Sequence, residues 1–371
     1  MDENNSSAPE RFENFSTGST TFNYYGYSED DYGLSDVIKK PEKNPEKEAD
    51  YYVRLFSVVV YSITCVLGVL GNGIVIAVIC LRMKKSVHVI YLLQLAIADF
   101  LFTSFLPLTI VYTALNFHWI FGKVMCKLAS FILILNMFTS VFLLTIISLD
   151  RCISVIYPVW SQNHRTTELA SCICIVAWVL ASLLSLPSLF FRDTVTRSDG
   201  VTSCFNNYSL SVSRTDSEDP KHISITIARV IIGFLVCFII ITVSYLILIF
   251  KLKRNRLAKS RKPLKIILCI IVAFFVCWCP YHVLSILEIK YSSLDISIFR
   301  FGMPMATALA TANSCMNPVL YVFMGQDFKQ FKTSILSMLA NALSDDPVHS
   351  RSSHQSFSKV SSITEKESIV L

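Results

Sequence analysis

The sequence predicts an all-α membrane protein, a seven-transmembrane helix bundle followed by a short amphipathic eighth helix. Three observations predict this fold. Hydrophobic residues make up 53% of the 371 residues and charged residues only 16%, against about 25% charged residues in typical globular proteins. The apolar residues gather in seven runs, each long enough for the ~20-residue helix that crosses a bilayer. Basic residues are concentrated in some of the segments between these runs.

The N-terminal segment, residues 1–50, is polar and acidic, and its low apolar content predicts disorder. It lacks the basic and short apolar regions of a cleaved signal peptide, so we expect the first span to direct membrane insertion. Four N-x-[ST] sequons are candidate glycosylation sites, which requires the outer side of the membrane: Asn4, Asn5, Asn14 and Asn207.

Residues 51–324 contain the seven spans. Lipid offers no hydrogen-bonding partners, so each apolar run must satisfy its own backbone groups as a helix. The expected spans cover residues 55–81, 89–115, 124–150, 169–191, 223–250, 266–288 and 296–323. Their odd number places the two termini on opposite sides of the membrane.

The basic residues fix the orientation. The first connecting segment carries Arg82, Lys84 and Lys85, and the link between the fifth and sixth spans carries eight lysines and arginines with no acidic residue. Such segments are typically cytoplasmic. The sequence therefore predicts a multi-pass plasma-membrane protein with an extracellular N-terminus. Its net charge of +6 lies mainly in these loops, and we expect membrane lipid rather than nucleic acid as a partner.

Two further elements follow the seventh span. In residues 325–340, apolar side chains recur with helical spacing opposite lysines, which predicts a short helix on the inner membrane face. The tail, residues 341–371, is predicted to be disordered. Its hydroxyl groups are candidate phosphorylation sites: Ser350, Ser352, Ser353, Ser356, Ser358, Ser361, Ser362 and Thr364.

Polar groups inside the spans are the first functional candidates, because ionisable residues at bilayer depth are costly. Asp99 in the second span is the clearest case, although a packing residue bonded to its neighbours is an alternative. Asp150 and Arg151 end the third span and can form a local ion pair that exposes Arg151 when broken. Pro280 and Pro318 kink the sixth and seventh spans, because proline lacks a backbone donor.

These residues together resemble the rhodopsin-like G-protein-coupled receptor family over about residues 50–335. The order and span placement of six motifs carry the resemblance: Gly71-Asn72, Leu95-Ala-Ile-Ala-Asp99, Asp150-Arg151-Cys152, Trp178, Cys277-Trp-Cys-Pro280 and Asn317-Pro-Val-Leu-Tyr321. The resemblance implies a disulfide between Cys126 and Cys204. It also implies a sodium ion as allosteric ligand, held by Asp99, Ser140, Asn313, Ser314 and Asn317.

The family resemblance further implies an activation mechanism. Trp278 would change rotamer over Phe274, and the sixth span would swing outward at Pro280 to open a cleft for a G protein. Arg151, Tyr245 and Tyr321 would rearrange in that cleft, with Pro318 as the hinge of the seventh span. One departure is Cys237, which stands where the family usually has proline in the fifth span. We therefore expect a weaker helical bulge there.

Within the family, several receptor classes are disfavoured. Leu133 replaces the aspartate of amine receptors, and Thr311 replaces the lysine that binds retinal in opsins. The remaining resemblance is to chemoattractant peptide receptors, and among them to the chemerin receptors. It is carried by Asn116-Phe-His-Trp119, Trp160-Ser-Gln-Asn-His-Arg165, Cys204-Phe-Asn-Asn207 and Tyr321-Val-Phe-Met-Gly-Gln-Asp-Phe-Lys329. This resemblance implies a chemerin-like peptide or protein agonist, inhibitory G proteins and arrestin as partners.

The outer halves of the spans carry charges suited to a peptide ligand. Arg229 lies about two turns into the fifth span, Arg192 ends the fourth and Glu288 ends the sixth. A planar guanidinium matches a carboxylate, so we expect Arg229 to receive a peptide C-terminus. Interfacial snorkelling is the alternative for Arg192, and it is the favoured interpretation for Arg300.

Other functions stay open. A receptor for formyl peptide or anaphylatoxin would share these features, and so would a scavenger that internalises its ligand without signalling. A transporter is less favoured because the sequence shows no internal repeat. An enzyme is the least favoured, because no nucleophile–base pair or metal-ligand set is present, and no cofactor besides the sodium ion is expected.

Overall fold

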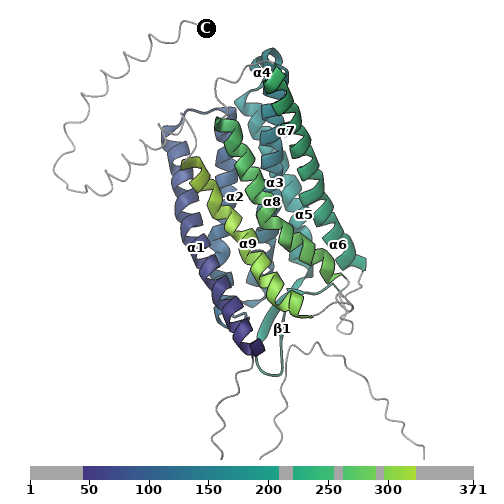
Figure 1. The fold of residues 1–371 in the computed structure, drawn as a ribbon. Helices are drawn as coiled ribbons and strands as arrows, with labels where there is room; N and C mark the ends of the chain where they lie inside the picture. Colours follow the sequence, from purple (N-terminus) through teal and green to yellow (C-terminus); the bar gives the residue numbers. More distant parts are fainter. Residues whose placement is uncertain (1–44, 209–219, 255–261, 290–295, 323–371) are drawn as a thin grey trace, which may run out of the picture.

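The computed structural model describes residues 45–208, 220–254, 262–289 and 296–322 (Figure 1). The predictions for residues 1–44, the 325–340 helix and the 341–371 tail lie outside these ranges, and so do the eight phosphorylation sites and the sequons at Asn4, Asn5 and Asn14. The backbone of Tyr321 is described as part of the last helix, whereas its side chain is not.

Long helices packed side by side form the bundle in Figure 1. Among the described residues, six helical segments are long and apolar enough to cross a membrane, and a further long helix, α9, packs against α1 and α8 and completes the bundle. The spanning elements are α1 (Pro45–Arg82), α2 (Val87–Ala114), α3 (Gly122–Ile156), α5 (Thr167–Phe191), α6 (Pro220–Val230) with η1 (Ile231–Val236) and α7 (Cys237–Arg254), α8 (Lys262–Glu288) and α9 (Ile296–Val322). The predicted fold class is confirmed.

Most helix ends fall within a few residues of the apolar boundaries, and the start of α1 is the exception. This helix begins at Pro45 rather than at residue 55. Its first turns carry Glu46, Lys47, Glu48 and Asp50. Polar residues allow a helix to continue into water, so the apolar run marks the membrane boundary and not the end of the helix.

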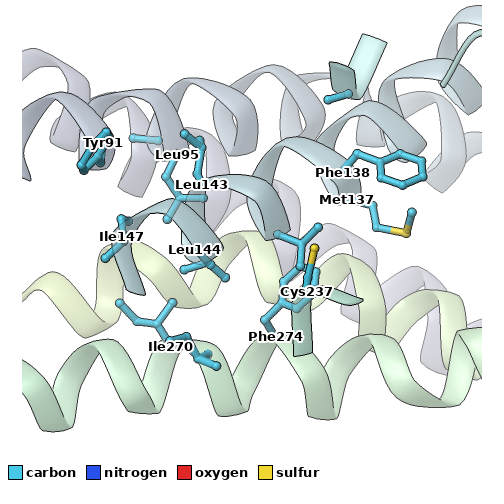
Figure 2. Close-up of a cluster of buried hydrophobic side chains, with 14 of the residues drawn as sticks. Tyr91, Leu95, Met137, Phe138, Leu143, Leu144, Ile147, Cys237, Ile270 and Phe274 are labelled. Atoms are coloured by element: carbon cyan, nitrogen blue, oxygen red, sulfur yellow. The ribbon is translucent and has the colours of Figure 1, made fainter. Parts of the chain in front are cut away.

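The hydrophobic core surrounds α3, whose apolar stretch is more buried than that of the other described spans. Figure 2 shows Met137, Phe138 and Leu144 of α3 among side chains from α2, α7 and α8. The outward faces of the other helices expose aliphatic and aromatic side chains such as Val176 and Phe190. Exposed apolar surface on all outer faces is the pattern expected of a protein surrounded by lipid.

A β-hairpin closes the outer end of the bundle. Strands β1 (Arg192–Thr196) and β2 (Thr202–Asn206) pair antiparallel, with Thr194 opposite Cys204. A disulfide joins Cys204 to Cys126 at the top of α3, with the two Cα atoms 5.9 Å apart. The backbone N–H of Trp119 also donates to the carbonyl of Thr202 at 2.7 Å. The hairpin is therefore held to α3 and to the loop between α2 and α3.

The fifth span contains a wide turn next to Cys237, the residue that replaces the family's usual proline. Residues Ile231–Val236 form a π-helix, η1, between the α-helical segments α6 and α7. The thiol of Cys237 donates to the carbonyl of Ile232, with 3.3 Å between sulfur and oxygen. A bulge therefore forms here without proline, and its lower strength stays a prediction.

Two glycines on α1 allow close packing of neighbouring helices. A Cβ atom at Gly68 would lie 2.3 Å from Cγ2 of Thr103 on α2, and one at Gly71 would lie 2.9 Å from Cβ of Pro318 on α9. These distances are shorter than any real carbon–carbon contact. A glycine is therefore required at each position for α1 to approach its two neighbours.

We predict that Gly68→Ala destabilises the bundle by about 1–3 kcal/mol, the usual cost of overpacking a core. Gly73→Ala is the matched control on the same helix, because a Cβ there would lie 3.4 Å from the ring of Phe100 and needs no rearrangement. Thermal unfolding of both variants in detergent measures the effect. Equal midpoints for the two variants would show that α1 can move away from Thr103 at no cost.

Candidate functional site

A polar cluster lies in the middle of the bundle, around the fully buried carboxylate of Asp99. Asn136 of α3 donates to Oδ1 of Asp99 at 3.0 Å, and Asn317 of α9 donates to Oδ2 at 2.6 Å. The hydroxyl of Ser314 donates to Oδ1 of Asn136 at 3.3 Å. Asn72 of α1 donates to the backbone carbonyl of Ser314 at 3.0 Å. One carboxylate thus links four helices through neutral side chains.

The residues around Asp99 suit a singly charged cation. Ser140 and Asn313 are buried, as are Ser314 and Asn317. The hydroxyl of Ser140 has no hydrogen-bond partner among the described residues. One carboxylate with neutral oxygens balances one positive charge, and hard cations prefer oxygen ligands. No group of three or more histidine, cysteine or acidic residues that could hold a metal occurs in the described part of the chain.

The cytoplasmic end of α3 contains an ion pair that bridges two elements. Both oxygens of Asp150 accept from Arg165, each at 2.7 Å. Arg165 directly follows α4 (Pro158–His164), so the pair holds this short helix against α3. The sequence pattern paired Asp150 only with the adjacent Arg151. The phenol of Tyr245 lies within electrostatic range of the Arg151 guanidinium.

The aromatic residues of α8 form another part of the buried core. The rings of Phe274 and Trp278 are both buried, with centroids 6.1 Å apart. Pro280 follows within the same helix, and Pro318 lies inside α9 beside Asn317. The structure therefore brings together the predicted rotamer pair and places a proline in each of the two helices expected to bend.

The outer half of the bundle contains a cavity of about 310 Å³ between α1, α2, α3, α9 and the hairpin. Its lining is mainly apolar and aromatic, and among the described residues that line it Arg192 is the charged one. Phe117 lines it in a left-handed backbone conformation, φ 60°, which is costly for a bulky residue and recurs at functional positions. Other lining residues are Tyr61, Phe102, Leu106, Tyr112, Leu133 and Met303.

Arg229 lies in α6, the outer segment of the fifth span, and its side chain is half-buried. Its Nη2 donates to the hydroxyl of Ser188 on α5 at 3.0 Å, and its Nε is buried with no partner among the described residues. No acidic side chain of the described residues forms an ion pair with it. Its hydrogen-bond partner among the described residues, Ser188, is neutral, the guanidinium of Arg192 lies within electrostatic range, and Nε of Arg229 remains an unused donor.

Arg192 and Glu288 lie at the rim above Arg229. Arg192 donates to Oδ1 of Asn206 at 3.0 Å and to the Cys204 sulfur at 3.3 Å. Glu288 lies within electrostatic range of Arg192 and His222. Burial raises the pKa of Tyr208, which follows β2, while the charge of Arg229 acts in the opposite direction. Two guanidinium groups and one carboxylate, those of Arg192, Arg229 and Glu288, thus lie within electrostatic range of the Tyr208 ring.

Arg300 differs from its predicted snorkelling role. It forms an ion pair with Asp50 in the first turns of α1. This pairing escaped the sequence pattern because the residues are 250 positions apart. The pair joins the outer ends of the first and last described helices.

Comparison with known proteins identifies the family. The model of the "7 transmembrane receptor (rhodopsin family)" matches residues 71–321. The chain belongs to this family. "Chemerin-like receptor 1" from Rattus norvegicus is 52% identical over 354 residues, covering 92% of this chain and 95% of the relative. The Homo sapiens protein of that name is 54% identical over 336 residues, 88% and 89% of the two chains. "Chemerin-like receptor 2" from Homo sapiens is 41% identical over 330 residues, 87% and 89% of the two chains.

Membership of the rhodopsin family makes the chain a multi-pass receptor of the plasma membrane rather than an enzyme. In this receptor, sequence reasoning did not predict two polar side chains that hydrogen-bond to the candidate residues Asp99 and Asp150. Asn136 lies on an apolar stretch of α3, one turn before Ser140, and that helical spacing is a signal that could have found it. Arg165 has no such signal, because its contact with Asp150 depends on how the chain folds back after α4.

Proposed function

We propose that this receptor responds to a chemerin-like peptide or protein and signals through inhibitory G proteins and arrestin. The observation that carries the proposal is the guanidinium of Arg229, whose buried Nε has no partner among the described residues, in an outer half that also contains an aromatic cavity. A peptide with an apolar, aromatic end and a free carboxylate fits both features. The names of the curated relatives support chemerin over other chemoattractants.

The carboxylate is assigned to Arg229 on energetic grounds. A buried charge is costly unless it is paired and hydrogen-bonded. Ser188 satisfies one donor of the guanidinium and leaves Nε unused. A carboxylate would bring a compensating negative charge, and its oxygens would accept hydrogen bonds from the planar guanidinium. The peptide therefore enters with its C-terminus first, and Arg192 and Glu288 steer it from the rim.

A cyclic AMP assay in cells that express the receptor tests the signalling proposal. The C-terminal peptide of chemerin, a formyl peptide and an anaphylatoxin are compared side by side, with arrestin recruitment measured in parallel. Inhibition of cyclic AMP synthesis and arrestin recruitment by the chemerin peptide alone are expected. Activation by one of the other ligands would reassign the agonist. Uptake of the chemerin peptide with neither response would favour a scavenger.

We predict that amidating the C-terminus of the chemerin peptide lowers its affinity for the native receptor by about 10- to 100-fold, because a hydrogen bond to a charged group contributes ~1.5–3 kcal/mol. In Arg229→Ala the same amidation should have little effect, since the partner is gone. Binding of both peptides to both receptors gives the coupling between carboxylate and guanidinium.

Arg300→Ala is the matched control, because it removes an arginine that is already paired with Asp50. This variant should keep the full amidation penalty. Arg229→Lys retains the charge without the planar fork and should show an intermediate penalty. If amidation weakens binding to native receptor and Arg229→Ala equally, the carboxylate does not bind at Arg229.

A further inference from the structure

The wide turn in the fifth span lies inside the membrane-spanning part of the chain, where residues Ile231–Val236 adopt a π-helical conformation. A π-helical stretch contains an extra residue, and its backbone hydrogen bonds join residues five apart instead of four. Such stretches are rare, and in lipid no water competes for or replaces their hydrogen bonds. A side-chain donor next to the turn can therefore stabilise it by adding a hydrogen bond.

The Cys237 thiol supplies it. Cys237 is the first residue of α7 and its side chain is buried, with 4% exposed. Its Sγ lies 3.3 Å from the carbonyl oxygen of Ile232, five residues earlier. Thr145 on α3 lies near the same sulfur, and its own hydroxyl donates to the carbonyl of Val141 at 2.7 Å. Figure 2 shows Cys237 among side chains of the core, beside Phe274 of α8.

The wide turn also fits the surface of α3. Gly233 is buried in the middle of η1, and a Cβ atom there would lie 2.8 Å from Cε1 of Phe138 and 3.3 Å from Cε of Met137. The backbone of the turn thus rests directly on these two side chains. The ring of the next residue, Phe234, packs against Phe275 and His282 of α8.

The extra residue in the turn changes the direction in which the side chains of the preceding segment, α6, point relative to α7. One residue corresponds to roughly 100° of rotation about a helix axis. Arg229 lies immediately before the turn, in α6, whereas Ile241 and Tyr245 of α7 are fixed in the core after it. If η1 relaxed to a regular α-helix, Arg229 would rotate relative to α7 and leave Ser188.

We infer that Cys237 is a positioning residue: its thiol holds the wide turn through the Ile232 carbonyl and thereby directs Arg229 toward the ligand. The inference rests on the proposed role of Arg229 and extends it. A neutral thiol is a weak donor, but the carbonyl it satisfies has no solvent to compete for it. A residue that looks like a core cysteine therefore determines the geometry of the binding site.

Binding of the free-acid and amidated chemerin C-terminal peptides tests the inference. Cys237→Ala removes the donor, and we expect about five- to tenfold weaker binding of the free acid, together with a smaller amidation penalty. Cys237→Ser keeps a donor and should restore both values. Cys174→Ala is the matched control, because it removes another buried thiol, on α5. Wild-type behaviour of Cys237→Ala, or failure of serine to restore it, overturns the inference.

An infrared measurement on ligand-free receptor gives an independent readout. The S–H stretching band that disappears in Cys237→Ala should lie at the lowered frequency of a hydrogen-bonded thiol, and the frequency of a free thiol would overturn the inference. If the native receptor does not distinguish acid from amide, the role of Arg229 fails, and with it the directing role of Cys237. The infrared band still decides separately whether the thiol holds the turn.

Discussion

Replacing Cys126 or Cys204 by serine is expected to remove most agonist binding from the cell surface. The disulfide between them closes a segment of 78 residues and joins the hairpin to α3. A closed loop of this size contributes about 4 kcal/mol in the chain-entropy account. Arg192 also donates to the sulfur of Cys204 and to Asn206 on the same strand. Loss of the disulfide therefore frees the hairpin that borders the cavity, and with it the side chain of Arg192.

Surface labelling and binding of the chemerin peptide, measured on the same cells, separate loss of folding from loss of the site. Cys80→Ser is the matched control, because Cys80 is an exposed free cysteine on α1. It should bind like the native receptor. The prediction fails if surface-expressed Cys126→Ser binds the peptide with native affinity, or if peptide mapping of native receptor finds both thiols free.

Agonist affinity is expected to fall as sodium concentration rises, and Asp99→Asn should abolish this dependence. Asp99 supplies the only carboxylate of the buried cluster, with Asn136 and Asn317 as its direct partners among the described residues. Replacing it with an amide keeps the shape and removes the charge that a cation requires. If the ion favours the inactive state of the bundle and the agonist the active one, each lowers the affinity for the other.

The measurement is peptide affinity across a sodium series at constant ionic strength, with an organic cation as replacement. Asp193→Asn is the matched control, because it makes the same chemical change on the outer hairpin, where Asp193 pairs with exposed Lys123. That variant should keep the native sodium dependence. An undiminished sodium effect in Asp99→Asn would rule out Asp99 as the anchor.

The sequence could predict the helices because lipid leaves a backbone only one regular solution along a single apolar run. It could also predict Asp99 and Trp278, because each is chemically unusual in its own segment. Contacts between residues far apart in the sequence could not be predicted from it. The pairs Arg165–Asp150 and Arg300–Asp50 depend on where loops and helix ends meet in space, and no local pattern in the sequence joins the two residues of either pair.

Cys237 shows a different limit. The absence of proline suggested a weaker bulge, because propensity arguments treat each residue type by its usual effect on the backbone. In the structure a side-chain donor performs the stabilising role, and Gly233 allows the turn to lie on Phe138. Both effects depend on packing against α3, which a single helix considered alone cannot reveal.

The contact of Gly71 with Pro318 has a mechanical consequence. Helices usually interlock through ridges of side chains, and sliding one past the other requires the ridges to be lifted out of their grooves. At this contact one surface is bare backbone and the other is a compact ring. The two helices therefore interlock less at this contact than two ridged surfaces would. Any side chain added at Gly71 would have to push Pro318, and with it the inner end of α9, away from α1.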